Sequence, residues 1–275
     1  MTLSTIRNNP AKQKKVKTKK QKAIAATCAV AFWLLVWHVV SLCVGSELVL
    51  VSPVKVVQTL FTVIFDPDFL KTVWYSAARI LGGFFTALTL GTVLGWVASR
   101  FWIIETLLRP ITAVIKATPV ASFIILVLLW FSGKNLSVII SILMVFPVIY
   151  TNVLEGIRSA DEKLLEMAQV FRLSVGKKLL YIYLPAVAPF FVSACSVSLG
   201  LCWKSGIAAE VIGTPDGSIG AVFYQAKIFL QTSELLAWTV VVVFISVAFE
   251  KLFMLLLRLI LKKLKMEDVL NGKRA

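Results

Sequence analysis

The residues that could do chemistry are few, and most of them stand in apolar stretches. The sequence has one histidine, His38, which excludes a histidine-based metal cluster and argues against a histidine-dependent nucleophilic triad. Its four cysteines form no C-x-x-C pair, so we interpret them as small buried apolar residues. We therefore predict no metal site and no catalytic residue in this chain. The cysteines are Cys28, Cys43, Cys195 and Cys202.

Two ionisable residues, Lys204 and Glu210, interrupt the apolar segment at 187–212. Their separation corresponds to about 240° around a helix of ~3.6 residues per turn, so they cannot easily pair with each other. Ionisable groups inside a membrane are costly and therefore point to function. For Lys204 we predict either a place in a translocation path or a buried structural ion pair. For Glu210 we predict either the same path or the outer interface. Ser196 and Gly200 precede Lys204 on the same face and complete the predicted lining of the path.

The run from Gly200 to Ser205 has some similarity to a phosphate-binding loop. It lacks the glycine before Lys204 and lies inside an apolar span, so it fails both the G-x-x-x-x-G-K-[ST] pattern and the context that the pattern needs. We predict that the chain has no ATP-binding motif of its own and is not an enzyme. If transport is active, its energy comes from another subunit or from an ion gradient.

These residues belong to a chain of 275 residues that is 59% apolar and 16% charged, with a net charge of +15. Soluble domains average about 45–50% apolar and about 25% charged residues. The composition therefore excludes intrinsic disorder and argues against a soluble nucleic-acid-binding protein. We predict an all-α membrane protein, since about 20 apolar residues form a helix that crosses the bilayer. Six segments qualify, at 23–44, 80–98, 111–131, 136–154, 187–212 and 235–261; Lys116 and Pro119 interrupt the third.

Cations mark one side of the membrane. Residues 1–22 hold eight Lys or Arg, the loop after the second segment three, the connection after the fourth five and the tail from Arg258 six, whereas the alternate connections hold four. By the positive-inside rule, this asymmetry predicts a multi-pass membrane protein with both termini in the cytoplasm. No A-x-A-like site follows the first segment, so we interpret it as an uncleaved anchor. The basic tail at 1–22 is either solvated or attracted to anionic lipid.

Small residues recur every four positions in two of these segments, and such ladders let membrane helices approach closely. In the second segment the ladder predicts a packing face, with a substrate groove as the alternative. The fifth segment has two ladders on opposite faces, one through Lys204 and one through Glu210, so we expect other helices to enclose it. The ladder of the second segment consists of Gly83, Ala87, Gly91 and Gly95.

Two polar connections have patterns of their own. Ser52-Pro53 begins a predicted outer helix at 53–65, which ends at the turn Asp66-Pro67-Asp68. The insert at 155–186 is long for a connection, and its two apolar stripes predict two short helices across the cytoplasmic face, with a join near Gly176 and an end at Pro185. A short amphipathic helix at this place is suited to docking into the groove of a partner.

The insert resembles the EAA loop of binding-protein-dependent ABC importer permeases. Glu166-Met167-Ala168 and Ile182-Tyr183-Leu184-Pro185 match the Glu-Ala-Ala and Ile-x-Leu-Pro parts of that loop at the expected separation. Arg172 stands where the family has glycine, and Gly176 is the candidate to take over the turn.

The resemblance implies that the insert couples the chain to ATPase subunits. In that role Glu166 makes a polar or capping contact in a docking groove, Ala168 permits close approach, and Pro185 sets the angle at which the fifth span leaves the insert. The other residues of the loop with a predicted coupling role are Met167, Arg172, Gly176, Ile182 and Leu184.

The wider resemblance covers about residues 52–252 and is strongest to the branch that serves sulfonates, taurine and nitrate. Members of that branch also resemble permeases for thiamine- or riboflavin-related compounds. Trp203-Lys204-Ser205 departs from the more apolar segment of the sulfonate group. The matching motifs are Ser52-Pro53-x-x-Val56, Arg79-x-x-x-Gly83, Thr118-Pro119, Leu129-Trp130-Phe131-Ser132-Gly133 and Phe146-Pro147-x-x-x-Thr151-Asn152.

The resemblance implies a type I ABC importer permease fold, with six transmembrane helices, a short external helix and a two-helix coupling insert at 155–186. We divide the chain into a basic tail at 1–22, a first transmembrane helix at 23–44, a core permease domain at 45–261 and a C-terminal tail at 262–275. The implied assembly is a homodimer in the lipid bilayer of the bacterial plasma (inner) membrane, with two cytoplasmic subunits that bind ATP and Mg and an external solute-binding protein. From the composition we expect no nucleic-acid partner. The implied solute is a sulfonate, taurine, nitrate or similar anion, or alternatively a thiamine- or riboflavin-related compound.

Two other classes stay open. A membrane-embedded enzyme needs clustered His, Asp or Glu, and the group around Asp161, Glu162 and Glu166 alternates with cations, as a solvated helix face does. A gradient-driven secondary transporter would use Lys204 and Glu210 as ion sites and would show inverted repeats, which we do not detect. Co-purification of an ATPase separates an importer from both.

Overall fold

The chain is described by a computed structural model over residues 19–264, with side chains from residue 24 onward. It divides after Lys55 into two compact units, each of which is described by itself. The first unit holds helix α1 (Lys19–Val44), which is long and apolar enough to cross a membrane and agrees with the predicted first span. The predicted tails at 1–22 and 262–275 lie almost entirely outside the described residues.

Helix α2 (Pro53–Ile64) begins and ends close to the predicted outer helix. The backbone N–H of Lys55 donates to Ser52 Oγ at 3.4 Å, so the serine occupies the capping position and the proline the first turn. At the other end, the backbone N–H of Asp68 donates to Asp66 Oδ1 at 2.8 Å, which forms the predicted turn.

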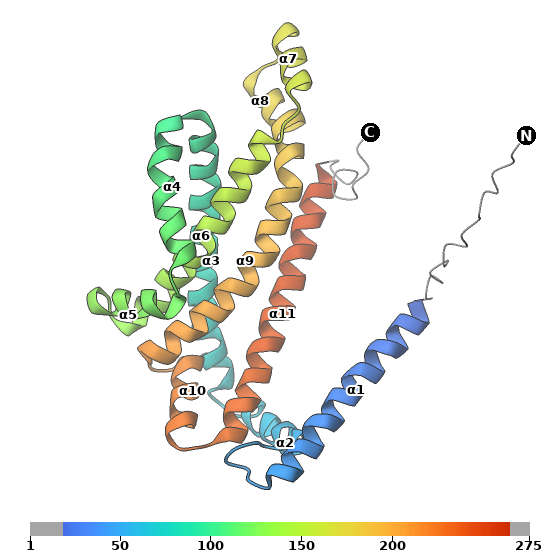
Figure 1. Cartoon of the computed structure of the whole chain (residues 1–275), viewed down its shortest axis with the longest axis vertical. Helices are drawn as coiled ribbons and strands as arrows, with labels where there is room; N and C mark the ends of the chain where they lie inside the picture. Colours follow the sequence, from blue (N-terminus) through green and yellow to red (C-terminus); the bar gives the residue numbers. More distant parts are fainter. Residues whose placement is uncertain (1–18, 265–275) are drawn as a thin grey trace, which may run out of the picture. The chain divides into compact units, whose positions relative to one another are not determined.

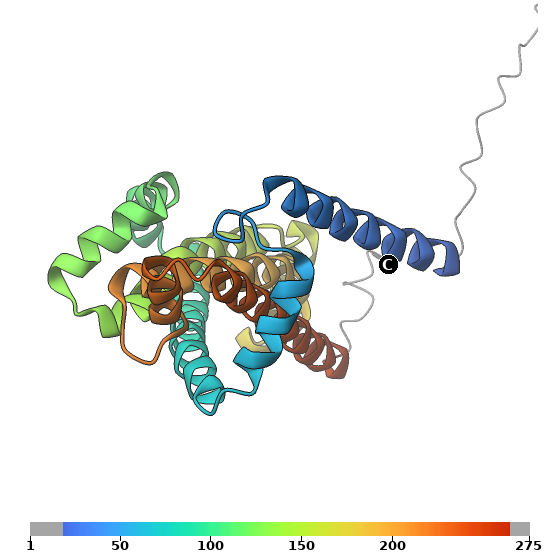
Figure 2. The ribbon, with the colours of Figure 1, turned by 90° about the horizontal axis from the view of Figure 1, so that it is seen from below.

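Three long helices form the core of the second unit (Figures 1 and 2), namely α3 (Phe69–Arg100), α6 (Gly133–Arg158) and α9 (Leu184–Gly213). Helix α6 packs along both of the others, and α11 (Thr232–Lys263) packs on α9. The predicted second span and the polar segment before it are one continuous helix, α3. The buried cluster that joins the four helices includes Ile80, Phe84, Ile149, Leu199 and Trp238.

The ladder of small residues in α3 lies against α6. All four of its members are buried. A Cβ atom on Gly83 would lie 2.6 Å from the Val138 carbonyl oxygen, and one on Gly91 would lie 2.9 Å from Ile149 Cβ. The two backbones therefore approach more closely than larger residues allow, and this close packing is how membrane helices associate.

The predicted third span at 111–131 is not one helix. The structure has α4 (Trp102–Ala117) and α5 (Val120–Trp130), bent by 110°, and the pair projects to one side of the core in both views. Thr118 is extended because it precedes Pro119, which has no N–H to continue α4. Among the described residues, five helices are long and apolar enough to span a membrane, or six if the bent pair counts as one span.

The two ends of the second unit carry different structures (Figure 1). At one end lies the insert, with α7 (Glu162–Val170), α8 (Val175–Lys178) and the π-helical turn η1 (Leu179–Tyr183). At the other end lies α10 (Ile219–Ile228), which the sequence analysis did not predict. The predicted second helix of the insert is also different, because it is a single turn that continues through η1 into α9.

Candidate functional site

One face of α9 is fully buried against the rest of the chain. Its residues are the ladder that passes through Glu210. A Cβ atom on Gly206 would lie 2.6 Å from Ile80 Cγ1 of α3 and 3.1 Å from Ser141 Oγ of α6, so the glycine permits the close packing of three helices. The buried ladder consists of Ala194, Ser198, Cys202, Gly206 and Glu210.

The face of α9 that contains Lys204 is open. Lys204 is exposed, Gly200 and Ala208 are half-buried, and a Cβ atom on Gly200 would meet nothing within 4 Å. The expectation that other helices enclose both ladders is therefore wrong within this chain. Since a charged side chain facing lipid is costly, this face must meet water or another protein chain in the membrane.

Lys204 takes part in no salt bridge within residues 24–264. Of the two predicted roles for this residue, a buried structural ion pair is therefore not found in the described part of the chain. Because this ammonium group is exposed on a helix that crosses the membrane, we infer that its environment is water or a protein interface.

Ser196 is half-buried and contacts α11. Its Oγ donates to Glu250 Oε1 of α11 at 2.8 Å. Ser196 and Glu250 also line a cavity together with Lys251 and Arg258. The hydrogen bond satisfies a polar pair between two spans and fixes α11 on α9.

Glu210 is completely buried, although the sequence analysis allowed it to reach the outer interface. Ser76 Oγ of α3 donates to Glu210 Oε2 at 2.6 Å, and the backbone N–H of Gly220 donates to the same oxygen at 3.4 Å. The backbone N–H of Ile219 in turn donates to Ser76 Oγ at 2.9 Å. The carboxylate therefore binds the first turn of α10, where backbone N–H groups favour negative charge.

The first turn of α10 fits this arrangement closely. Ser218 Oγ accepts from the backbone N–H of Ala221 at 3.0 Å and caps the helix. A Cβ atom on Gly220 would lie 2.2 Å from Glu210 Cβ, so a side chain has no room there. Ser76 and Gly220 were not among the predicted site residues. Ser218 before Ile219 and Gly220 is a helix-start signal. No local pattern connects this helix start to Ser76 in α3.

The turn after α7 adopts the left-handed conformation that the family's glycine predicts, with arginine in its place. Arg172 has φ of 49°, and its backbone N–H donates to the Gln169 carbonyl at 3.0 Å. The N–H of Leu173 donates to the Ala168 carbonyl at 2.9 Å, which closes the helix end. Gly176 lies inside α8, so the expectation that it takes over the turn is wrong.

Ala168 faces inward and is completely buried. It packs in a small cluster with Ala160 and Ile182, so the close approach that it permits is between two parts of the insert. Glu166 and Met167 are exposed on the outer side of α7. Asp161 Oδ1 caps the helix by accepting from the Lys163 backbone N–H at 2.9 Å.

The Ile-x-Leu-Pro segment connects the insert to the spans. Ile182 packs on α7, whereas Leu184 packs with Ala188 and Leu261 at the α9–α11 contact. The N–H of Leu184 donates to the Leu179 carbonyl, five residues back, in a π turn. This wider turn accommodates Pro185, whose ring would clash with the carbonyl four residues earlier in a regular α-helix.

The tip of the insert exposes large apolar side chains. Val170, Phe171 and Val175 are 79%, 71% and 80% exposed, and Met167 lies beside them. Clusters of exposed apolar residues commonly mark a protein interaction site. These residues lie outside the apolar spans, where their side chains contact water unless a protein partner covers them.

Comparison with known proteins agrees with this architecture. The family model "Binding-protein-dependent transport system inner membrane component" matches residues 87–266. A Bacillus subtilis (strain 168) protein named as an aliphatic sulfonates transport permease is 29% identical over 232 residues, which cover 83% of each chain. The taurine transport system permease of Escherichia coli (strain K12) is 26% identical over 220 residues, 78% of this chain and 80% of that one.

A nitrate import permease of Synechocystis is 26% identical over 214 residues, which cover 74% of this chain and 76% of the relative. Each of these relatives aligns along most of its own length, and the family match contains the insert as well as the α6–α9 core. The chain belongs to the family of binding-protein-dependent transport system inner membrane components, as a permease subunit of an ABC importer.

Proposed function

We propose that this chain forms half of a path for a small anion that carries a sulfonate or nitrate-like group. The relatives are named for aliphatic sulfonates, taurine and nitrate. The observation that supports the proposal in this chain is Lys204, an exposed cation without a salt bridge among the described residues, on the open face of α9. A fixed positive charge along a pore favours anions by electrostatic attraction.

The path lies between two copies of the chain. In one copy the surface around Gly200 and Lys204 is open, and lipid is a poor neighbour for it. A second copy related by two-fold symmetry presents the same face, so the two lysines border one enclosed passage. Glu210 contributes from the opposite face, by fixing α10 at the outer end of the path.

Two ATPase subunits bind ATP and Mg and dock on the insert. The exposed tip at Met167, Val170 and Phe171 supplies the apolar contact, and Glu166 supplies a polar one. Residues 175–213 form one continuous helical stretch that ends in α9, and Ala168 of α7 packs on Ile182 within it, so a displacement of α7 is transmitted to the helix that carries Lys204. Access to the path then alternates as the two helical units rotate between inward-open and outward-open states.

The sidedness of the assembly follows from the distribution of cations. The insert and both termini are cytoplasmic, since the connections on that side hold most of the Lys and Arg residues. The end of the molecule with α10 then faces outward, where a solute-binding protein delivers the anion.

The function is tested by uptake of radiolabelled taurine, an alkanesulfonate and nitrate into vesicles that contain the complete transporter. For Lys204→Met we expect at least about a tenfold loss of anion uptake, as removal of about 1.4 kcal/mol or more of attraction predicts. Lys71→Met, which removes an exposed lysine of α3, is the matched control and should retain uptake. Normal uptake by the Lys204→Met transporter at normal expression would exclude this role.

The coupling role is tested separately by co-purification. Glu166→Arg should reduce the recovery of the ATPase subunits with the permease, whereas Glu47→Arg at the opposite connection should leave it unchanged. Absence of any ATPase from the wild-type preparation would contradict the proposed assembly.

A further inference from the structure

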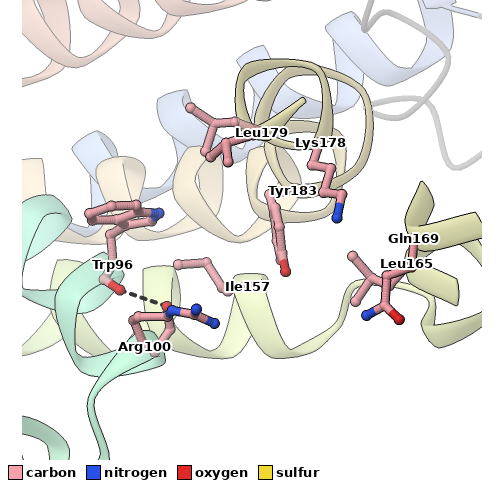
Figure 3. A pocket seen from close by; sticks show the side chains of 10 residues that line it. Trp96, Arg100, Ile157, Leu165, Gln169, Lys178, Leu179 and Tyr183 are labelled. Atoms are coloured by element: carbon pink, nitrogen blue, oxygen red, sulfur yellow. Dashed lines mark hydrogen bonds between the residues drawn. The ribbon is translucent and has the colours of Figure 1, made fainter. Parts of the chain in front are cut away.

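A cavity of about 480 Å³ lies between the insert and the end of α3 (Figure 3). Arg100 and Trp96 of α3 lie on one side and Lys178 and Tyr183 on the other, with Ile157 of α6 between them. The ten lining residues include two cations and no acid. Neither cation takes part in a salt bridge within residues 24–264, so the cavity carries uncompensated positive charge.

A groove of about 450 Å³, lined mainly by apolar side chains, continues from this cavity. The two hollows share Trp96, Ile157, Leu179 and Tyr183, so they form one surface with a charged end and an apolar end. The groove is also bordered by Val93 of α3 and Val187 of α9.

The place of this surface in the membrane fits its two-part character. Arg100 is the last residue of α3, and Lys178 is the last residue of α8 before the chain enters α9. Cations and aromatic residues such as Trp96 and Tyr183 are typical of the level where lipid headgroups meet the acyl region. These features fit a charged end at headgroup depth and an apolar end at acyl-chain depth.

We propose that this surface binds one anionic glycerophospholipid, with its phosphate between Arg100 and Lys178 and an acyl chain in the groove beside Val93. Basic pockets between membrane helices are known binding sites for acidic lipid headgroups. A free anion would use the charged cavity and leave the apolar groove empty, whereas a phospholipid fills both. The charge complementarity and the continuous groove therefore favour a lipid.

A bound lipid would connect α3 to the part of the insert that leads into α9. Gln169 and Leu165 of α7 also line the charged cavity, so the headgroup touches the helix that we propose to dock on the ATPase. The coupling insert would then be more firmly held in membranes rich in anionic lipid. This consequence depends on the proposed function, but the lipid site itself does not.

The test measures retention of phosphatidylglycerol and of neutral phosphatidylcholine by native mass spectrometry of the purified permease–ATPase complex. The wild-type protein should prefer phosphatidylglycerol by at least about tenfold. Arg100→Gln with Lys178→Gln should weaken phosphatidylglycerol binding by about thirtyfold, since each cation near an anionic headgroup contributes about fivefold. The control Arg109→Gln with Lys177→Gln, which removes two exposed cations outside the cavity, should change it by less than about threefold.

Two further variants separate lipid binding from folding and from binding of a free anion. Arg100→Lys with Lys178→Arg preserves the charge and should retain the lipid, while Val93→Trp fills the groove and should weaken both lipids. The proposal would be overturned if the two double-glutamine variants lost equal amounts of phosphatidylglycerol binding, or if the wild type retained no phospholipid. It would also be overturned if Val93→Trp left lipid binding unchanged, or if millimolar inorganic phosphate displaced the lipid. If the ATPase does not co-purify, the lipid measurement can still be made on the permease alone, so the two failures are distinguishable.

Discussion

Helix α9 carries its two ionisable residues in opposite environments. Glu210 is enclosed by α3 and α10 and has hydrogen-bond donors arranged around one carboxylate oxygen. Lys204 is exposed beside a glycine with empty space in front of it. An ionisable residue in a span can therefore either stabilise the packing of the helices or line the proposed path. How closely the neighbouring small residues are packed distinguishes these two roles.

The largest expected effect comes from exchanging glycine for leucine on the two faces. Gly206→Leu should lower the free energy of unfolding by about 3 kcal/mol or more, because the side chain would have to displace Ile80 in a close-packed core. Gly200→Leu should instead raise it by up to about 1 kcal/mol, because the site is open and leucine has a higher helix propensity than glycine. Denaturation of the detergent-purified variants measures both values.

The effect of the open-face substitution should appear in transport. Gly200→Leu should fold normally, but its side chain narrows the proposed path beside Lys204. Solute uptake should therefore fall while ATPase association is retained. Equal destabilisation by the two substitutions would show that the open face is also a tight packing surface, and the comparison would fail.

A smaller effect is expected from removing the buried carboxylate. Glu210→Ala leaves the Ser76 hydroxyl and the Gly220 N–H without their acceptor, which predicts a loss of about 2–3 kcal/mol in the free energy of unfolding. Glu210→Gln retains an acceptor oxygen and most of the volume, so its loss should be smaller. Hydrogen exchange of the first turn of α10 should accelerate in the alanine variant.

Lys204→Met is the matched variant on the open face, and its stability should stay within about 0.5 kcal/mol of the wild type. A Glu210→Ala protein that unfolds normally but has lost uptake would instead assign the glutamate to the path.

Local patterns could predict the helices but not the contacts between them. Runs of apolar residues are sufficient to locate α6 and α9, because the requirement for about 20 apolar residues is a property of one segment. The bond between Ser76 and Glu210 joins residues 134 positions apart, and neither residue's neighbours encode the pairing. The 110° bend after Thr118 depends on tertiary packing as well, since proline predicts a break but not its angle.

The turn after α7 differs from these contacts, because the family pattern located the turn correctly. What it predicted wrongly was the effect of arginine at the position of the family's glycine. Arg172 was expected to shift the turn to Gly176. A non-glycine residue in the left-handed region costs only about 1–2 kcal/mol, and the two backbone bonds that close α7 are sufficient to hold it there.

The smallest predicted effect concerns Arg172, and it tests whether an exposed residue at this turn can be substituted without a change in stability. Arg172 is exposed like Lys204, yet its backbone is strained, so Arg172→Gly should stabilise the insert by up to about 1 kcal/mol after the greater entropy of glycine in the unfolded chain is subtracted. Slower hydrogen exchange at Leu173 would measure the gain. Arg172→Ala is the control, since it removes the charge but keeps the Cβ atom and should give no such protection. If alanine protects Leu173 as well as glycine does, the effect belongs to the arginine's charge and not to its backbone.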